Sequence, residues 1–173
     1  MPGDAYHIRR CSPAELRALP EIERAAGRLF LLTKHPLVAA HGTLALEFLR
    51  EQQRAGLVWV AAGEGGQPIG FAVARELAGS AHLQELSVHP DHGRRGIGTR
   101  LAREVCEWAR GAGHDLVTLS TFRDVPWNAP FYARLGFEVI GEEELGEELA
   151  GIRAGEAAAG LPVEDRVFMW LGL

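Results

Sequence analysis

Several features that define other protein classes are scarce in this 173-residue chain. It has only two cysteines, Cys11 and Cys106, far apart in sequence, so a secreted fold held by disulfides is not indicated. No apolar run approaches the roughly 18 residues of a membrane span, and Met1–His7 carries no basic-then-apolar signal pattern. No internal repeat or linker divides the chain. We therefore expect a single cytoplasmic domain over residues 1–173 with no membrane partner.

Basic residues are also fewer than acidic ones, 18 Lys and Arg against 23 Asp and Glu, so the formal net charge is −5. That balance does not favour a nucleic-acid partner and suits a cationic substrate better. The acidic run Glu142–Glu148 is usually a solvated face, and otherwise it could attract a polyamine, an aminoglycoside or a basic peptide terminus. His89 and His92 are close in sequence but lack a Cys or carboxylate set with ligand spacing, so no metal site is expected.

The apolar share of 47% and the many turn signals predict a folded domain of alternating strands and helices. Ser12, Pro13 and Glu15 form a helix-start pattern. Trp59, Trp108 and Trp170 are expected in the core. Strands are expected at 6–10, 57–62, 69–74, 83–88, 116–121, 137–140 and 166–171, and helices in two pieces over 13–54, from about 96 to 111, and over 128–135. Residues 141–163 are rich in Glu, Gly and Ala and give no clear pattern.

The most informative segment is His89–Arg100, in which a glycine-bearing turn follows a strand and opens into an amphipathic helix. Glycines at 93, 96 and 98 let the backbone curl around a ligand, and the unpaired N–H groups of the first helical turn then point at it. The helix dipole adds partial positive charge, and Arg94, Arg95 and Arg100 add full charges. A ligand carrying phosphates is expected there.

Two common phosphate-binding sequences do not fit this turn. A Walker motif needs Lys-Ser or Lys-Thr after its last glycine, whereas Gly98 is followed by Thr99-Arg100. A dinucleotide-binding site normally places its glycines after the first strand of the fold, and here the turn follows roughly the fourth.

The residues Leu86-Ser-Val-His-Pro-Asp-His-Gly-Arg-Arg-Gly-Ile-Gly-Thr99, followed by Asn128-Ala-Pro-Phe-Tyr-Ala-Arg-Leu-Gly-Phe137, resemble the GNAT superfamily of N-acetyltransferases. The resemblance is sharp over about residues 68–140. It implies an α/β fold with a mostly antiparallel mixed sheet of six to seven strands, a parallel, splayed pair of fourth and fifth strands, and about four helices. It also implies transfer of an acetyl group from acetyl-CoA, as co-substrate, to an amine.

By this resemblance, the turn holds the pyrophosphate of acetyl-CoA and the preceding strand pairs with its pantetheine arm. Asn128 is expected either to contact the pantetheine or to cap the start of its helix, and the two alternatives stay open. The family pattern usually has Gln or Arg where this chain has Gly93, and Arg94 or Arg95 could supply the missing contact. The expected cofactor residues are Leu86, Ser87, Val88, Arg94, Arg95, Gly96, Ile97, Gly98, Thr99 and Asn128.

Acetyl transfer to an amine needs a proton acceptor and a proton donor. An alkylammonium has a pKa near 10.4 and must lose a proton before it can attack, while the leaving thiolate gains from a nearby donor. The resemblance assigns the donor to Tyr132, whose alternative role is a core residue. Strand alternation puts Glu85 on one face with Leu83 and Ser87, and this carboxylate is the candidate base, with ordered water as the alternative.

The acceptor itself is not indicated by any motif. Phe122, Arg123, Asp124 and Trp127, after the fifth expected strand, could line its pocket or form an ordinary packed loop. The resemblance favours an acetyl-CoA-dependent N-acetyltransferase acting on a small cationic or peptide amine. The alternatives are an acyl-CoA-binding sensor without turnover, and transfer to oxygen or of longer acyl groups. A homodimer is open.

Overall fold

The computed structural model describes residues 6–173, in two compact units. Residues 1–5 lie outside the described residues, and the expectation that the N-terminus carries no signal peptide rests partly on them. The first unit comprises Met1–Arg75 and Gln84–Glu107, and the second comprises Glu76–Leu83 and Trp108–Leu173. Seven strands are hydrogen-bonded in the order β1-β2-β3-β4-β5-β7-β6, and β4 and β5 run parallel. The mixed α/β sheet expected from the sequence is confirmed.

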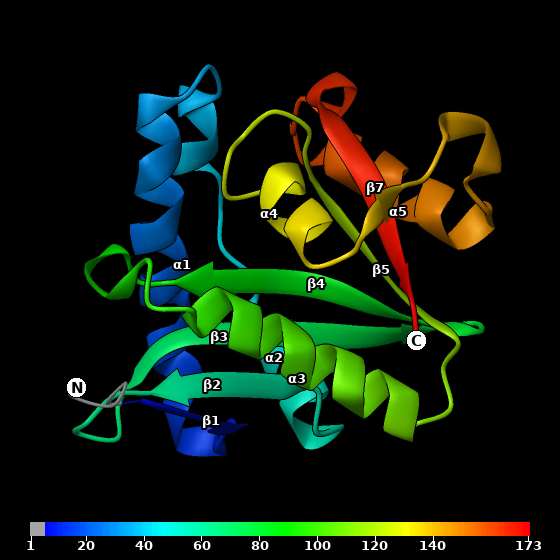
Figure 1. Cartoon of the computed structure of the whole chain (residues 1–173). Helices are drawn as coiled ribbons and strands as arrows, with labels where there is room; N and C mark the ends of the chain where they lie inside the picture. The colour runs from blue at the N-terminus through cyan, green and yellow to red at the C-terminus, as the bar shows by residue number, and fades with distance from the viewer. Residues whose placement is uncertain (1–5) are drawn as a thin grey trace. The chain divides into compact units, whose positions relative to one another are not determined.

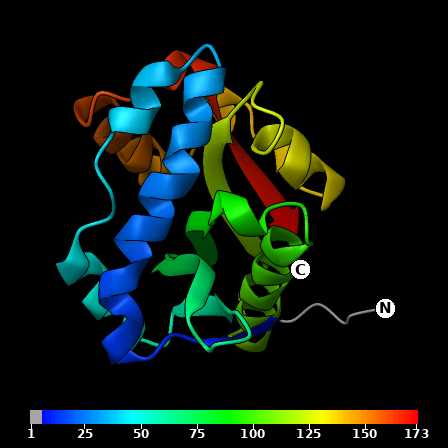
Figure 2. The same cartoon turned by 90° about the vertical axis from the view of Figure 1, so that its left-hand side faces the viewer.

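The first unit is a set of antiparallel strands covered by helices on both faces. Its strands are β1 (His7–Arg10), β2 (Val58–Ala62), most of β3 (Pro68–Leu77) and the end of β4 (Ser80–Val88). In Figure 1 helix α3 (Ile97–Gly111) crosses the near face of these strands, and Figure 2 shows α1 (Leu19–Gly27) on the opposite side. Helix α2 (Leu46–Arg54) also belongs to this unit.

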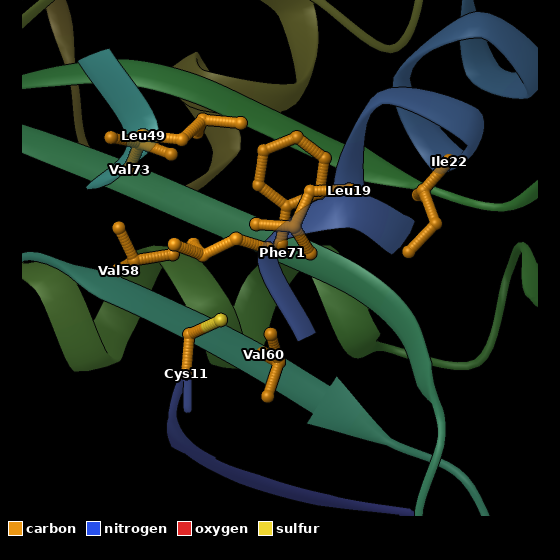
Figure 3. Packing of buried hydrophobic residues seen from close by; sticks show 9 residues of the cluster. Cys11, Leu19, Ile22, Leu49, Val58, Val60, Phe71 and Val73 are labelled. Carbon is orange, nitrogen blue, oxygen red and sulfur yellow. The ribbon is translucent and has the colours of Figure 1, made fainter. Parts of the chain in front are cut away.

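The core of the first unit lies between α1, α2 and the strands (Figure 3). Leu19 and Leu49 are fully buried against Phe71, because helical spacing places one apolar stripe of each helix on the sheet. Burial of a Leu or Phe side chain stabilises a fold by about 1.5–3 kcal/mol. The cluster consists of Cys11, Leu16, Leu19, Ile22, Leu49, Val58, Val60, Phe71 and Val73.

The second unit pairs β5 (Leu116–Phe122) with the closing strand β7 (Arg166–Gly172), and the two-residue β6 (Glu138–Val139) flanks β7. Its helices are α4 (Ala129–Arg134) and α5 (Glu147–Ala158). The parallel ladder between β4 and β5 joins Ala81–Leu83 to Val117–Leu119 and stops well before either strand ends. The expected splaying of the fourth and fifth strands requires their ladder to end early in this way.

Two details differ from the sequence-based expectations. Residues 6–173 form five α-helices where about four were expected, because the Glu/Gly/Ala-rich segment contains α5. Its many glycines and alanines leave no clear helical stripe of large apolar residues. Trp170 was expected in the core, yet it is 38% exposed, so that prediction was wrong. Alternation along β7 predicts two faces, but it does not reveal how fully each face is covered at the strand's end.

The carboxyl end of β5 is tied to its surroundings by an arginine that is largely buried. Arg166 pairs with Glu156 of α5 at 2.8 Å, donates to the carbonyl and hydroxyl of Ser120, and lies over the ring of Phe122. Both charged side chains are only about one-eighth exposed, at 12% and 13%. This contact positions the segment that precedes Asn128.

Loss of this ion pair should destabilise the fold, since it leaves a largely buried guanidinium without its anion. We expect Glu156→Ala to lower the free energy of unfolding by about 1–2 kcal/mol. Chemical denaturation followed by circular dichroism measures this change, and the exposed Glu147→Ala on the same helix is the control. Equal stability of the two variants would contradict a structural role for the pair.

Candidate active site

The expected phosphate-binding turn lies within the first unit, between β4 and α3. Pro90–His92 form a short 3₁₀ turn, and α3 begins at Ile97. Arg100 N–H donates to the carbonyl of Gly96 at 3.0 Å, which is the first α-helical bond of α3. The N–H groups of Ile97, Gly98 and Thr99 precede that bond, so helix geometry leaves them directed out of the helix end. A 15-residue helix adds partial positive charge at this point.

The backbone of the turn adopts left-handed conformations at two positions. Arg94 has φ +60° and Gly96 has φ +76°. Glycine takes this conformation without cost, whereas a side chain at such a φ is strained by about 1–3 kcal/mol. Arg94 and Arg95 are both exposed beside these amides. A backbone that turns this sharply ahead of a helix start can surround an anionic group.

A close backbone contact explains why glycine occupies position 93, where the family usually has Gln or Arg. Its own φ is an ordinary −62°, and its N–H donates to the carbonyl of Pro90 at 3.0 Å. A Cβ built at this position lies only 3.2 Å from that same carbonyl oxygen. The tight 3₁₀ turn therefore disfavours a side chain at 93. Arg95, one of the two expected substitutes, has its guanidinium 3.2 Å from Nδ1 of His92.

Tyr6 supports the turn from a distant part of the chain and was not expected from the sequence. Its hydroxyl donates to the carbonyl of Arg95 at 3.1 Å, between the two left-handed residues. The Arg100 guanidinium lies 5.0 Å from the centre of the Tyr6 ring. The Tyr6 side chain is 6% exposed, and its bond to Arg95 is partly buried. No sequence signal links residues 89 positions apart.

We expect Tyr6→Phe to weaken cofactor binding by about three- to tenfold, the worth of one net hydrogen bond. The substitution keeps the ring beneath Arg100 and removes only the hydroxyl that holds the turn. Isothermal titration with coenzyme A measures the affinity, and a thermal melt of the free protein serves as the control for general destabilisation. An unchanged affinity would show that the turn holds its shape without this bond.

The residues of β4 that were expected to meet the pantetheine arm divide between two faces. A Cβ built at Gly70 would contact Val88 and Ile97, so Val88 faces α3, and Leu86 follows it by alternation. Ser87 and Glu85 face the other side, and the Ser87 hydroxyl donates to Oε1 of Glu85 at 2.7 Å. The expected pairing of Glu85 with Ser87 on one face agrees with this bond. The β4–β5 ladder ends at Leu83, ahead of all four residues.

The second unit contains the other expected site residues, Asn128 and Tyr132, around α4. Asn128 occupies the N-cap position of α4, but its side chain makes no hydrogen bond to the helix, so the side-chain capping alternative was wrong. Its Oδ1 instead accepts the Thr121 hydroxyl at 2.8 Å and the Phe122 N–H at 3.2 Å, which fixes α4 to the end of β5. This bond pattern identifies the carbonyl side of the amide, because a backbone N–H must meet an acceptor.

Tyr132 lies on α4 with its ring packed between two phenylalanines. The ring centres of Phe131 and Phe137 are 5.0 Å and 5.7 Å away, both near edge-to-face. The residue is 8% exposed. Phe122, the last residue of β5, is buried beneath Arg166, whereas Trp127, in the loop before α4, is 39% exposed, so these two expected pocket residues differ in accessibility.

The pattern of the Acetyltransferase (GNAT) family matches residues 23–137, which are two thirds of the chain and include every site residue expected from the sequence. The chain belongs to this family. An uncharacterized N-acetyltransferase of Methanocaldococcus jannaschii is 35% identical over 80 residues, which are 42% of this chain and 35% of that protein. The match thus spans about a third of that relative's length.

Solved structures of this GNAT protein's relatives share its fold at low sequence identity. The PaiA N-acetyltransferase of Thermoplasma acidophilum, in complex with coenzyme A, has a TM-score of 0.70 at 18% identity, covering 97% of this chain and 99% of that one. The ribosomal-protein-S18-alanine N-acetyltransferase of Escherichia coli has a TM-score of 0.67 at 17% identity, covering 96% and 93%. At such identities the likeness establishes the fold.

Residues 6–173 contain neither a membrane-spanning helix nor a cluster of metal ligands. No helix of this part is long and apolar enough to cross a membrane. Nor do three His, Cys, Asp or Glu side chains come together there in a way that could hold a metal ion.

Proposed function

We propose that this GNAT-family protein transfers an acetyl group from acetyl-CoA to the primary amine of a small cationic molecule or peptide, by direct attack in a ternary complex, with the chain acting as one catalytic domain. The observation that carries the proposal is the turn at 94–99. Its two left-handed residues and the three amides that open α3 suit a pyrophosphate. Membership of the acetyltransferase family supports coenzyme A as the carrier of that pyrophosphate.

Different residues of the chain bind different parts of acetyl-CoA. The amides of Arg94 to Thr99 hold the pyrophosphate, with Arg94 and Arg95 adding charge beside it. The strand residues Leu86 to Val88 and the amide of Asn128 hold the pantetheine arm. When bound, acetyl-CoA supplies an activated thioester carbonyl.

The chemical step removes two protons from the ammonium nitrogen and supplies one to the leaving sulfur. Glu85 accepts a proton from the acceptor's ammonium group, which frees the nitrogen lone pair for attack on the acetyl carbon. As the new C–N bond forms, the C–S bond breaks and the electron pair leaves with sulfur. The Tyr132 hydroxyl donates a proton to that sulfur. The nitrogen passes its second proton, through water, to the Tyr132 oxygen, which leaves the neutral amide and the free thiol as products and the Glu85 proton to be released to solvent.

The test is a panel of primary amines with acetyl-CoA, in which free thiol is measured. Suitable probes are spermidine, tyramine, an aminoglycoside and a short peptide with a free N-terminus. We expect at least one amine to accelerate thiol release well above the rate in buffer. Tight coenzyme A binding with no acceleration by any amine would favour a non-catalytic acyl-CoA sensor instead.

A further inference from the structure

Two short 3₁₀ helices that follow α1 carry a concentration of exposed leucines. η2 (Arg28–Leu32) and η3 (Pro36–Ala40) pack against each other within the first unit, and both views show them at the end of that unit away from β1 (Figures 1 and 2). Leu31, Leu32 and Leu37 are 60%, 86% and 85% exposed. They are half of the six large apolar side chains that are exposed among residues 6–173. We call residues 28–40 the helical tip.

The exposure of these leucines is set by a well-defined backbone turn. The Thr33 hydroxyl donates to the carbonyl of Phe30 at 2.7 Å and accepts the N–H of His35 at 3.0 Å, so one side chain closes the turn between η2 and η3. His35 is buried, whereas the leucines on either side of it in sequence are exposed. This is the reverse of the usual distribution of apolar and polar side chains, so packing within the chain does not account for the leucines.

The helical tip also differs in charge from the rest of the chain. Residues 24–46 contain three basic residues, Arg24, Arg28 and Lys34, and no Asp or Glu, although the chain has a net charge of −5. Arg24 pairs with Glu21 on α1, and the basic residues of the tip itself are Arg28 and Lys34, both exposed. Long basic side chains can lie along apolar surface and keep their charge in water. An apolar projection with basic residues suits a partner that is anionic outside and apolar beneath.

The same features disfavour other occupants of this surface. The cationic acceptor of the proposed reaction would be repelled by it, and a symmetric contact between the tips of two copies would bring like charges together. A stable protein–protein contact also needs a complementary surface of about 800 Å² on each side. The headgroup region of a bilayer, in contrast, takes up a few protruding side chains without a shaped counterpart.

We propose that the helical tip docks the protein on an anionic lipid bilayer. Leu31, Leu32 and Leu37 insert at the boundary of headgroups and acyl chains, while Arg28 and Lys34 lie against the lipid phosphates. The sequence-based expectation of no membrane partner came from the lack of a spanning segment, a criterion that does not detect a few side chains on a folded domain. The inference goes beyond acetyl transfer and does not depend on it.

Co-flotation of the purified protein with lipid vesicles tests the proposal. We expect the protein to bind vesicles of phosphatidylcholine and phosphatidylglycerol in equal parts. Binding to phosphatidylcholine alone should be at least about fivefold weaker, the effect of one basic residue near an anionic surface. Added salt should weaken binding to the mixed vesicles, because it screens that attraction. A protein that stays unbound in the presence of the mixed vesicles would overturn the proposal.

Matched variants test whether the helical tip is the surface involved. The double variant Leu32→Gln/Leu37→Gln should bind the mixed vesicles at least about tenfold more weakly, because two inserted apolar side chains are lost. The control is Val139→Gln on β6, where an apolar side chain 52% exposed is replaced outside the tip. Arg28→Gln should weaken binding about fivefold, and Arg103→Gln, at an exposed position of α3, should not. Equal binding by the double variant and Val139→Gln would overturn the proposal.

Two further outcomes would assign the surface to another occupant. Sedimentation without vesicles that shows a dimer in the parent and a monomer in the double variant would identify a second copy as the partner. Vesicle binding that Arg28→Gln weakens and the double variant leaves unchanged would mean a purely electrostatic contact, as with an acidic protein. Either result would overturn the insertion of the leucines. Coenzyme A affinity should be the same in all these variants, and failure of the amine panel would leave the vesicle result intact.

Discussion

Replacing Tyr132 by phenylalanine is expected to lower the turnover rate at least about tenfold, with little change in coenzyme A affinity. The ring is packed edge-to-face against Phe131 and Phe137, and phenylalanine preserves those contacts. Only the hydroxyl that protonates the leaving sulfur is removed. Initial rates at saturating acetyl-CoA and amine measure the effect.

The chain has only two tyrosines, and the second provides the control. Tyr6→Phe should weaken cofactor binding and leave kcat nearly unchanged, whereas Tyr132→Phe should do the reverse. An unchanged kcat in Tyr132→Phe would remove this residue from the mechanism and leave it as a core residue of α4. A general destabilisation of that variant would show as a lower melting temperature, which is measured alongside.

A side chain at Gly96 is expected to weaken coenzyme A binding by about 10- to 100-fold. Gly96 has φ +76°, where a β-branched residue is strongly disfavoured, so Gly96→Val either strains the turn or moves its amides. The space itself is not the obstacle, because a Cβ would lie 3.8 Å from the Tyr6 hydroxyl oxygen. Titration calorimetry with coenzyme A measures the loss.

Gly56 offers a control with nearly the same backbone geometry. Its φ is +75°, a Cβ there meets nothing within 4 Å, and it follows α2 in the same unit. Gly56→Val should therefore lower stability to a similar degree while coenzyme A affinity stays the same. Equal affinity losses in the two variants would mean that the effect at Gly96 is general destabilisation, and that the turn does not bind the cofactor.

The sequence predicts the order of strands and helices well because most elements have strong periodicity and clear breaks. The helix start near Gly96 lies within one residue of the observed Ile97, since glycine spacing and the apolar stripe agree there. Helix α5 was missed because its stripe is diluted by glycine and alanine. Burial of Trp170 was misjudged because coverage by neighbouring elements is a tertiary property.

In the candidate site, too, local patterns could be predicted from the sequence and tertiary contacts could not. The turn and the α4 motif are local patterns, so their residues could be named in advance. Tyr6 could not, because its bond to the Arg95 carbonyl depends on how distant segments pack. The capping role considered for Asn128 failed because a stronger set of donors, at Thr121 and Phe122, is available at the end of β5.

The most direct test of the account is the stoichiometry of acetyl transfer. The purified protein is incubated with acetyl-CoA and the amine panel, and free thiol and acetylated amine are quantified together. The account predicts equal amounts of the two products, formed much more slowly by Tyr132→Phe and, at limiting acetyl-CoA, by Gly96→Val. Thiol release that is independent of every amine, or tight coenzyme A binding without release, would contradict it.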